Sequence, residues 1–182
     1  WAWAPPGRRR QVAVGRRPTL AAENPMPTPL LLAALSLTAP PAAELDLLPP
    51  GPDAGRGWEF YPGAEFPGAG GELTIGADGV LTLRYDFTQG GAYVAAYRAI
   101  DPATPLSELR LEVRKPDLAQ LTLRATDSTG QVFQRPIRYE GEGWQPLVGS
   151  FSGWVHHFGG PNDGVVRQPL TRLGLLVEKT GL

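Results

Sequence analysis

The chain has 182 residues, of which 42% are hydrophobic and 19% are charged, and its formal net charge is −1. It contains no cysteine, which excludes disulfides, thiolate zinc sites and cysteine nucleophiles. The charge is unevenly spread, because residues 1–25 carry five Arg and one Glu, whereas residues 44–182 carry 12 basic and 17 acidic side chains. An acidic excess provides no basic surface to replace phosphate counterions, so a nucleic-acid partner is not expected.

The first 25 residues predict a disordered basic leader or a non-native extension. They begin with Trp1 rather than Met, and they combine Arg, Pro and Gly with little apolar periodicity. Such a stretch buries too little apolar surface to offset the chain entropy that folding would cost.

Residues 26–43 predict a signal peptide. An apolar run from Leu30 to Leu37 precedes small residues and Pro. The run is too short to span a bilayer, but it fits the hydrophobic region of an export signal that is cleaved near Ala43. Because no Lys or Arg lies between Met26 and this run, a short apolar helix or a disordered leader is the alternative. The signal predicts a secreted or periplasmic protein with no membrane association after the signal is removed.

The remainder divides into a Pro- and Gly-rich linker, 44–57, and a β-domain, 58–182. Apolar and polar residues alternate in 80–87, 107–114, 120–126 and 172–178, which is typical of half-buried strands. Turn residues separate these runs, "TDSTGQ" predicts a hairpin, and no amphipathic helical stretch is found. We therefore predict an all-β fold, an antiparallel β-sandwich of the jelly-roll type. Because the sequence ends in a strand pattern and a fresh turn, we expect this domain to be truncated at its C-terminus.

The stretch Trp154–Gly164, "WVHHFGGPNDG", is the first candidate for a site. Adjacent residues of an extended segment point to opposite faces, so His156 and His157 are a poor pair of ligands for one ion. The chain has no third histidine, so zinc is not expected. A Gly-rich loop can instead present polar and aromatic groups to a ligand, with loop packing as the alternative. The candidate ligand-binding residues are Trp154, His156, His157, Asn162, Asp163 and Tyr97.

Catalytic patterns are absent from the sequence. No serine lies in a G-x-S-x-G elbow, and most acids occupy alternating strand positions where charge keeps an outer face wet. We therefore do not expect this chain to be an enzyme by itself. A structural Ca²⁺ is left open, with oxygen ligands drawn from Glu59, Glu65, Glu72, Asp163 or Glu178, although no EF-hand loop is present.

Three motifs carry a family resemblance: "PGAEFPGA" (62–69), "YDFTQGGAYVAA" (85–96) and the W-x-H-x-x-GGPNDG loop. Over roughly residues 58–180 the chain resembles galactose-binding-like jelly-roll domains. These occur as carbohydrate-binding modules and as N-terminal ancillary domains of secreted bacterial glycoside hydrolases. The resemblance implies a non-catalytic domain that binds a polysaccharide or oligosaccharide on a concave face or loop edge, often with a structural Ca²⁺. It also implies a downstream catalytic domain in the same chain, and the alternative is a docking domain that packs on that neighbour without binding sugar.

Overall fold

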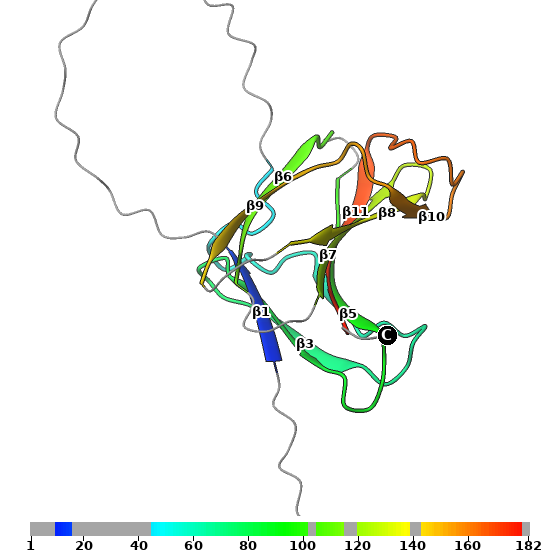
Figure 1. Ribbon diagram of the computed structural model, residues 1–182. Helices are drawn as coiled ribbons and strands as arrows, with labels where there is room; N and C mark the ends of the chain where they lie inside the picture. The colour runs from blue at the N-terminus through cyan, green and yellow to red at the C-terminus, as the bar shows by residue number, and fades with distance from the viewer. Residues whose placement is uncertain (1–9, 16–44, 102–104, 115–119, 139–142, 180–182) are drawn as a thin grey trace, which may run out of the picture.

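The computed structural model describes residues 10–15, 45–101, 105–114, 120–138 and 143–179 (Figure 1). Every regular element within these ranges is a β-strand. The strands are β1 (Arg10–Gly15), β2 (Trp58–Tyr61), β3 (Gly70–Ile75), β4 (Leu81–Asp86), β5 (Tyr93–Ala99), β6 (Glu108–Arg114), β7 (Gln120–Asp127), β8 (Val132–Ile137), β9 (Gln145–Ser150), β10 (His156–Phe158) and β11 (Leu170–Glu178).

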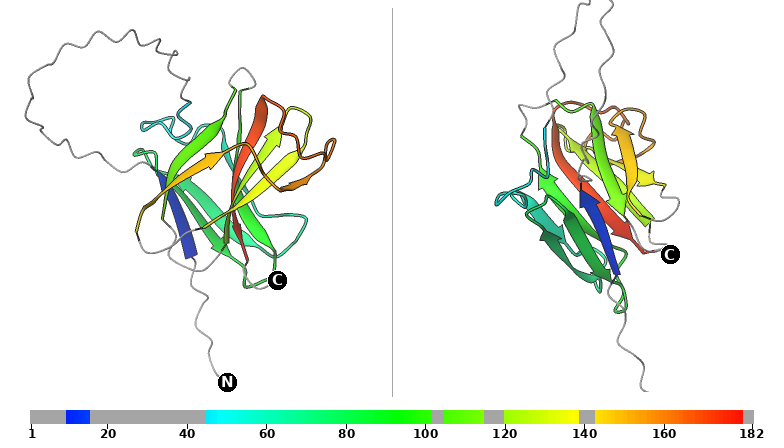
Figure 2. Two further views of the ribbon diagram at one scale, coloured as in Figure 1. Left: turned by 45° about the horizontal axis from the view of Figure 1, so that its top comes forward. Right: turned by 90° about the vertical axis from the view of Figure 1, so that its left-hand side faces the viewer.

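The strands form two antiparallel sheets that lie as two layers (Figures 1 and 2). The five-stranded sheet has the order β3-β4-β1-β6-β9, and the six-stranded sheet has the order β10-β8-β7-β11-β5-β2. The predicted all-β antiparallel fold is therefore confirmed. Within the described ranges no helix is long and apolar enough to cross a membrane.

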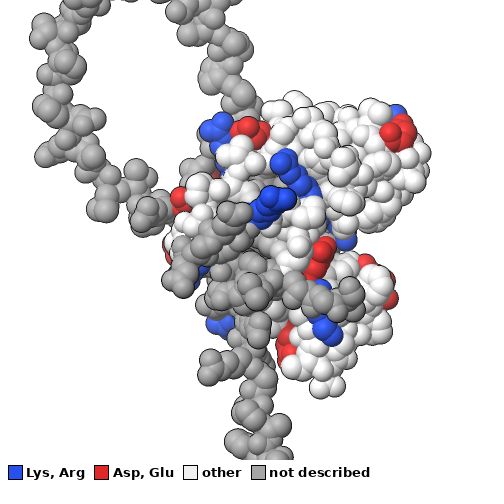
Figure 3. All heavy atoms as spheres, in the orientation of Figure 1, with Lys and Arg blue, Asp and Glu red and all other residues white. Residues whose placement is uncertain are grey.

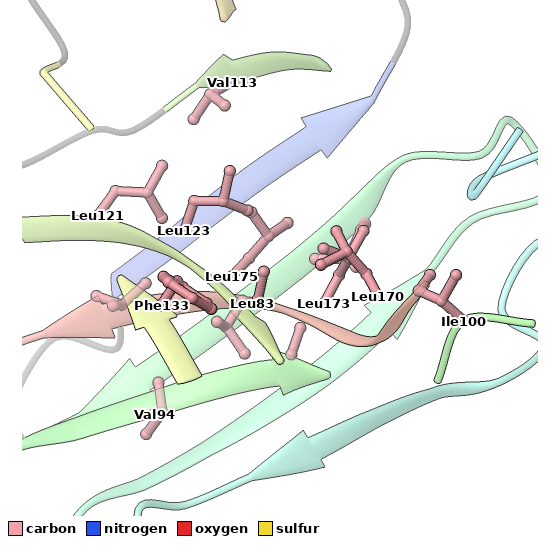
Figure 4. Packing of buried hydrophobic residues seen from close by; sticks show 14 of the residues in the cluster. Leu83, Val94, Ile100, Val113, Leu121, Leu123, Phe133, Leu170, Leu173 and Leu175 are labelled. Carbon is pink, nitrogen blue, oxygen red and sulfur yellow. The ribbon is translucent and has the colours of Figure 1, made fainter. Parts of the chain in front are cut away.

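The hydrophobic core lies between the two sheets (Figure 4). Leu83 of β4 and Val113 of β6 come from one sheet, and Leu123, Phe133 and Leu175 come from β7, β8 and β11 of the other. Each of these side chains is buried. Burial of one such side chain stabilises a fold by about 1.5–3 kcal/mol, so this layer holds the sheets together.

The alternating runs become strands where the sequence predicts them. In β4 the inward Leu81, Leu83 and Tyr85 are buried, whereas the residues between them are half-buried or exposed. The predicted hairpin joins β7 to β8, with Ala125 opposite Phe133. Strand β5 shows no such pattern, because Tyr93 to Tyr97 are all buried and both of its faces are therefore covered.

The structure differs from the prediction at Arg10–Gly15, where a leader without regular structure is expected. These residues form β1, which pairs with β4 on one side and with β6 on the other. "QVAV" alternates polar or small residues with Val, a pattern too short to stand out beside five arginines. The other residues of the predicted leader and all of the predicted signal peptide, 26–43, lie outside the described residues.

The described part of the predicted linker, 45–57, forms bends and turns. It nevertheless contributes to packing, since Leu47 and Leu48 contact the core and Ala54 is buried. The indole Nε1 of Trp58 donates a hydrogen bond to the carbonyl of Leu47 at 2.9 Å. This segment is therefore an irregular edge of the domain and not a free tether.

Candidate functional site

The outer face of the six-stranded sheet, which is turned away from the core, carries an unusual set of side chains. Because side chains alternate along a strand, the inward positions of Val94 and Leu123 turn Tyr93, Tyr97 and Arg124 outward. The register places Tyr97, Gly174 and Arg124 in one row across β5, β11 and β7. We call Tyr61, Glu65, Tyr93, Tyr97 and Arg124 the outer-face cluster.

Gly174 allows two members of this cluster to meet. A Cβ atom at position 174 would lie 2.4 Å from Cε1 of Tyr97, which is closer than real Cβ contacts. The glycine therefore lets the Tyr97 ring lie across β11 toward β7. The phenol of Tyr97 then accepts a hydrogen bond from Nη1 of Arg124 at 2.5 Å.

Arg124 is fixed by several partners at once. Its Nη1 also donates to the Tyr93 phenol at 3.3 Å, and its guanidinium carbon lies 5.0 Å from the centre of the Tyr93 ring. The amide of Gln134, with its oxygen turned toward β7, accepts from Nε at 2.8 Å and also from Nη2. Because hydrogen bonds and a cation–π contact hold this guanidinium, it is a rigid polar group in the middle of the sheet.

Glu65 reaches the cluster from the loop between β2 and β3, residues 62–69. Gly63 adopts φ 65°, and a Cβ there would lie 2.5 Å from the Tyr93 carbonyl oxygen, so the loop can pack directly on β5. A turn closes with the Phe66 amide donating to the Gly63 carbonyl at 2.8 Å. The Glu65 carboxylate consequently accepts hydrogen bonds from the phenols of Tyr61, at 2.8 Å, and Tyr93.

These contacts set the charges of the cluster. Partial burial acts to raise the pKa of Glu65, but hydrogen bonds from Tyr93, its own backbone and Tyr61, together with the Arg124 charge, outweigh it and lower that pKa. Burial and the hydrogen bond to Glu65 raise the pKa of Tyr93 well above its usual value. The hydrogen bond to Glu65 likewise raises the pKa of Tyr61. At neutral pH Glu65 is therefore ionised, and the phenols of Tyr61 and Tyr93 are neutral.

Two exposed phenylalanines flank this polar centre. Phe66 is 53% exposed, and its ring stands edge-on to Tyr93 with centroids 6.4 Å apart. Phe158 on β10 is 47% exposed, and its ring centre lies 5.8 Å from the Arg124 guanidinium. The face thus presents apolar ring surface on either side of hydrogen-bonding groups.

The shape of the molecule agrees with this arrangement. Strand β10 and the loop 62–69 stand at opposite ends of the curved six-stranded sheet in Figure 1. In the same orientation, Figure 3 shows the outline indented between two lobes, with basic and acidic side chains at the indentation. The outer face therefore combines aromatic rims with fixed polar groups, which are usual parts of a small-ligand site.

The predicted loop residues are distributed over different environments. Trp154 is buried in the core, with ring centroids 5.8 Å from Phe151 and 6.5 Å from Phe133, and its Nε1 donates to the Ser150 carbonyl at 2.5 Å. This ring is a packing residue and offers no surface on which a ligand can stack. His156 is exposed and lies opposite Gln134 in the register, on the outer face.

His157 lies on the other side of β10, as the alternation of an extended segment predicts. Its ring centre is 6.2 Å from that of Phe133, and its Nδ1 is hydrogen bonded to Oδ1 of Asn162 at 2.9 Å. Asn162 adopts φ 53°, a turn conformation that asparagine tolerates. The contact therefore ties the loop to β10 and leaves the two histidines on different faces.

Asp163 holds the same loop in place. Its carboxylate pairs with Arg167, with Oδ2 at 2.5 Å from Nη2, and accepts from the Val165 amide at 3.0 Å. The hydrogen bond from Arg167 is the largest cause of its lowered pKa. The backbone of the loop is anchored in turn, since the Asp163 amide donates to Oε1 of Gln131, which is fully buried.

Buried Asp127 connects this loop to the β7–β8 hairpin. Its Oδ1 accepts from the Thr129 amide at 2.8 Å and the Gln131 amide at 3.1 Å, and its Oδ2 accepts from the Arg167 amide at 3.1 Å. Its burial acts to raise its pKa, but these hydrogen bonds, together with one from the Thr129 hydroxyl, lower it. The "GGPNDG" half of the loop is thus held by a buried carboxylate network.

Metal ligands do not gather in the described part of the chain. No group of three or more His, Asp or Glu side chains there could hold an ion. Of the acids considered for Ca²⁺, Glu65 is engaged by two tyrosines and Asp163 by Arg167. The chemistry available on the outer face is therefore hydrogen bonding and ring contact.

Sequence reasoning selected Tyr97 as a candidate but did not select the residues that contact it, Arg124 and Tyr61. The alternation in 120–126 already predicts that Arg124 points away from the core, yet it cannot show that β11 brings Arg124 beside Tyr97. Glu65 and Phe66 lie within one of the three motifs that carry the family resemblance, Tyr93 lies within another, and Phe158 lies within the third. No family model matches this chain, and neither does any curated protein or solved structure. The chain is therefore described by its fold alone, as an all-β antiparallel domain.

Proposed function

We propose that the outer face of the six-stranded sheet binds a carbohydrate and that the chain is a non-catalytic binding domain. The observation that carries the proposal is the pairing of two exposed phenylalanines with a preformed polar cluster between them. Pyranose rings have an apolar face and a rim of hydroxyls, and this combination is complementary to both.

Each side chain has a role that follows from its contacts. Phe66 and Phe158 offer ring surface for stacking, and both are exposed. The ionised Glu65 can accept hydrogen bonds from sugar hydroxyls beyond those from its two tyrosines, because a carboxylate has about four acceptor positions. The Gln134 amide nitrogen and His156, on the same face, supply further polar groups.

The hydrogen bonds within the cluster favour binding because they reduce the side-chain entropy that is lost when a ligand binds. Tyr93, Tyr97 and Arg124 already hold one another in place. A ligand would therefore immobilise few side chains, although a small and wet site of this kind supports only modest affinity.

The electrostatics support binding rather than catalysis. A glycosidase needs a carboxyl group with a raised pKa as the general acid, and a second carboxylate about 5–10 Å away. The pKa of Glu65 is lowered instead, so it suits a fixed acceptor. A fixed acceptor of this kind is compatible with a carbohydrate-binding module. The resemblance of 62–69 and 85–96 to such modules supports the further proposal that this domain belongs to an exported glycoside hydrolase.

The test is affinity gel electrophoresis of the chain against a broad polysaccharide panel, followed by calorimetric titration of the best ligand. We expect Phe158→Ala to weaken binding about tenfold, the equivalent of about 1.4 kcal/mol. The matched control is Val148→Ala, since Val148 is 60% exposed but lies on β9 of the other sheet. Retardation by no polysaccharide, or equal effects of the two substitutions, would contradict the proposal.

The same experiment addresses the alternative, a domain that docks on a catalytic neighbour without binding sugar. Exposed Phe66 and Phe158 are also suited to a protein contact. If no saccharide binds, and a downstream catalytic domain added in trans protects both phenylalanines from solvent, docking is the function that this face supports.

A further inference from the structure

The five-stranded sheet is held together by its N-terminal strand. Strands β4 and β6 do not pair with each other in the described sheet, because β1 lies between them (Figure 2). Arg10 to Val14 pair with β4, and Ala13 to Gly15 pair with β6. Without β1 the sheet would consist of two antiparallel strand pairs, β3–β4 and β6–β9, each with a bare edge facing the other.

The attachment of β1 to the domain differs from that of every other described strand. Residues 16–44 separate β1 from the next described residue of the domain, whereas the longest connection between two other strands, from β10 to β11, comprises residues 159–169. The main contacts of β1 with other elements are those with β4 and β6, its two neighbours in the sheet. Ladder hydrogen bonds to these two strands hold β1 at the end of a long connection.

The edges beside β1 need a partner. Leu81 and Leu83 of β4 and Val113 of β6 are almost completely buried in the core, so the backbone that carries them lies close to the apolar interior. Unpaired backbone N–H and C=O groups at such a place are costly, and two facing strand edges form a template for an added strand. Addition of an extended segment to a sheet edge is an established mode of peptide recognition.

We propose that the space between β4 and β6 is a strand-acceptor site, and that its ligand is the segment Arg10–Gly15, which binds in the same manner when it is a separate peptide. As long as the chain is not cleaved near Ala43, the connection keeps this segment at an effective concentration of about the millimolar range, so the site is occupied. The inference does not depend on the carbohydrate-binding proposal, because it concerns the other sheet.

The experiment displaces the strand in the full chain and adds it back. Val14 pairs with both Leu81 and Val113, and Val14→Pro removes its backbone N–H and fixes its φ. The probe is a fluorescent, capped peptide of sequence RQVAVG, and binding is followed by anisotropy. We expect saturable binding to the Val14→Pro chain and at least tenfold weaker binding to the unsubstituted chain and to the control Arg8→Pro, which lies outside β1.

Two further measurements keep the result unambiguous. The peptide RQVAPG has the same charge as the probe, and it should not compete if the ladder is what binds. The thermal unfolding transition of Val14→Pro should stay cooperative. The proposal is overturned if Val14→Pro loses that transition, because β1 is then part of the folding unit. It is also overturned if the folded variant fails to bind the probe, or if the unsubstituted chain binds it equally well.

Discussion

The two faces of the six-stranded sheet are both closely packed, but they are packed with different chemistry. The inner face presents Val94, Leu123 and Leu175 to the opposite sheet, and the outer face presents Tyr93, Tyr97 and Arg124 with no sheet above them. Apolar side chains need only exclude water, whereas phenols and a guanidinium must also find partners. The side chains of the outer face are therefore held in place by specific hydrogen bonds, whereas those of the inner face are held by close packing.

The largest expected effect comes from making a cavity in the inner face. Leu123→Ala should reduce the free energy of unfolding by about 3 kcal/mol, because it removes a fully buried side chain between the two sheets. Urea unfolding followed by tryptophan fluorescence measures this. A loss below about 1 kcal/mol would show that the inner face is not the main source of stability.

The next effect tests the polar end of the inner face at Asp127. Asp127→Ala should cost about 2 kcal/mol, since it leaves the buried amide of Gln131 and the partly buried amide of Arg167 without their acceptor. Because the folded pKa of Asp127 is lowered, its contribution is complete above the unfolded pKa of about 4 and is lost as the pH falls through the folded value. The two proteins should therefore differ less in stability at pH 2 than at pH 7, and a constant difference would rule out this linkage.

On the outer face, Arg124→Lys should reduce the free energy of unfolding by about 1–2 kcal/mol. Lysine keeps the charge but cannot contact Tyr97 and Gln134 with one planar group. The matched control is Arg84→Lys. Arg84 pairs with Glu72 on the surface, so this substitution should cost less than about 0.5 kcal/mol. Equal losses in the two variants would mean that the outer-face hydrogen bonds contribute no more to the free energy of unfolding than a surface ion pair does.

The pH dependence at high pH separates the two faces further. Because the folded pKa of Tyr93 is raised, its contribution is complete below the unfolded pKa of about 10 and decreases as the pH rises toward the folded value. The stability of the unsubstituted chain should therefore fall more steeply between pH 9 and 11 than that of Tyr93→Phe. Parallel curves from urea unfolding at each pH would contradict the assigned environment.

The smallest effect on stability is expected for the exposed rings. Phe158→Ala should change the free energy of unfolding by less than about 0.5 kcal/mol, because Phe158 is half exposed. Thermal unfolding checks this, with Trp154→Ala as the contrasting variant. Because Trp154 is buried, Trp154→Ala should cost about 3 kcal/mol, as Leu123→Ala does. Similar losses for Phe158→Ala and Trp154→Ala would show that the loop is wrongly divided between surface and core.

The sequence predicts the inner face better than the outer face, and the reason is periodicity. Leu81, Leu83 and Tyr85 alternate with polar residues, so both the strand and its buried side can be predicted. Strand β5 is buried on both faces, and its continuous apolar run does not reveal which tyrosines point outward. Partners such as Arg124 and Tyr97 are brought together by strand order, which local pattern does not encode.

The same distinction explains the candidate loop. Its turn chemistry can be predicted from "GGPNDG", and the opposite directions of His156 and His157 follow from the extended geometry of β10. The burial of Trp154 cannot be predicted in this way, because an isolated tryptophan before a turn fits a surface platform and a core position equally well. Only its contacts with Phe133 and Phe151 place it in the core.

The most direct test of a carbohydrate-binding outer face is an amide NMR titration with the oligosaccharide that binds best in the panel. The proposal predicts that the shifted resonances cluster at Glu65, Phe66, Tyr93, Arg124 and Phe158, and that those of β9 in the other sheet remain unchanged. Shifts confined to Asn162 and Asp163, or to the five-stranded sheet, would contradict it.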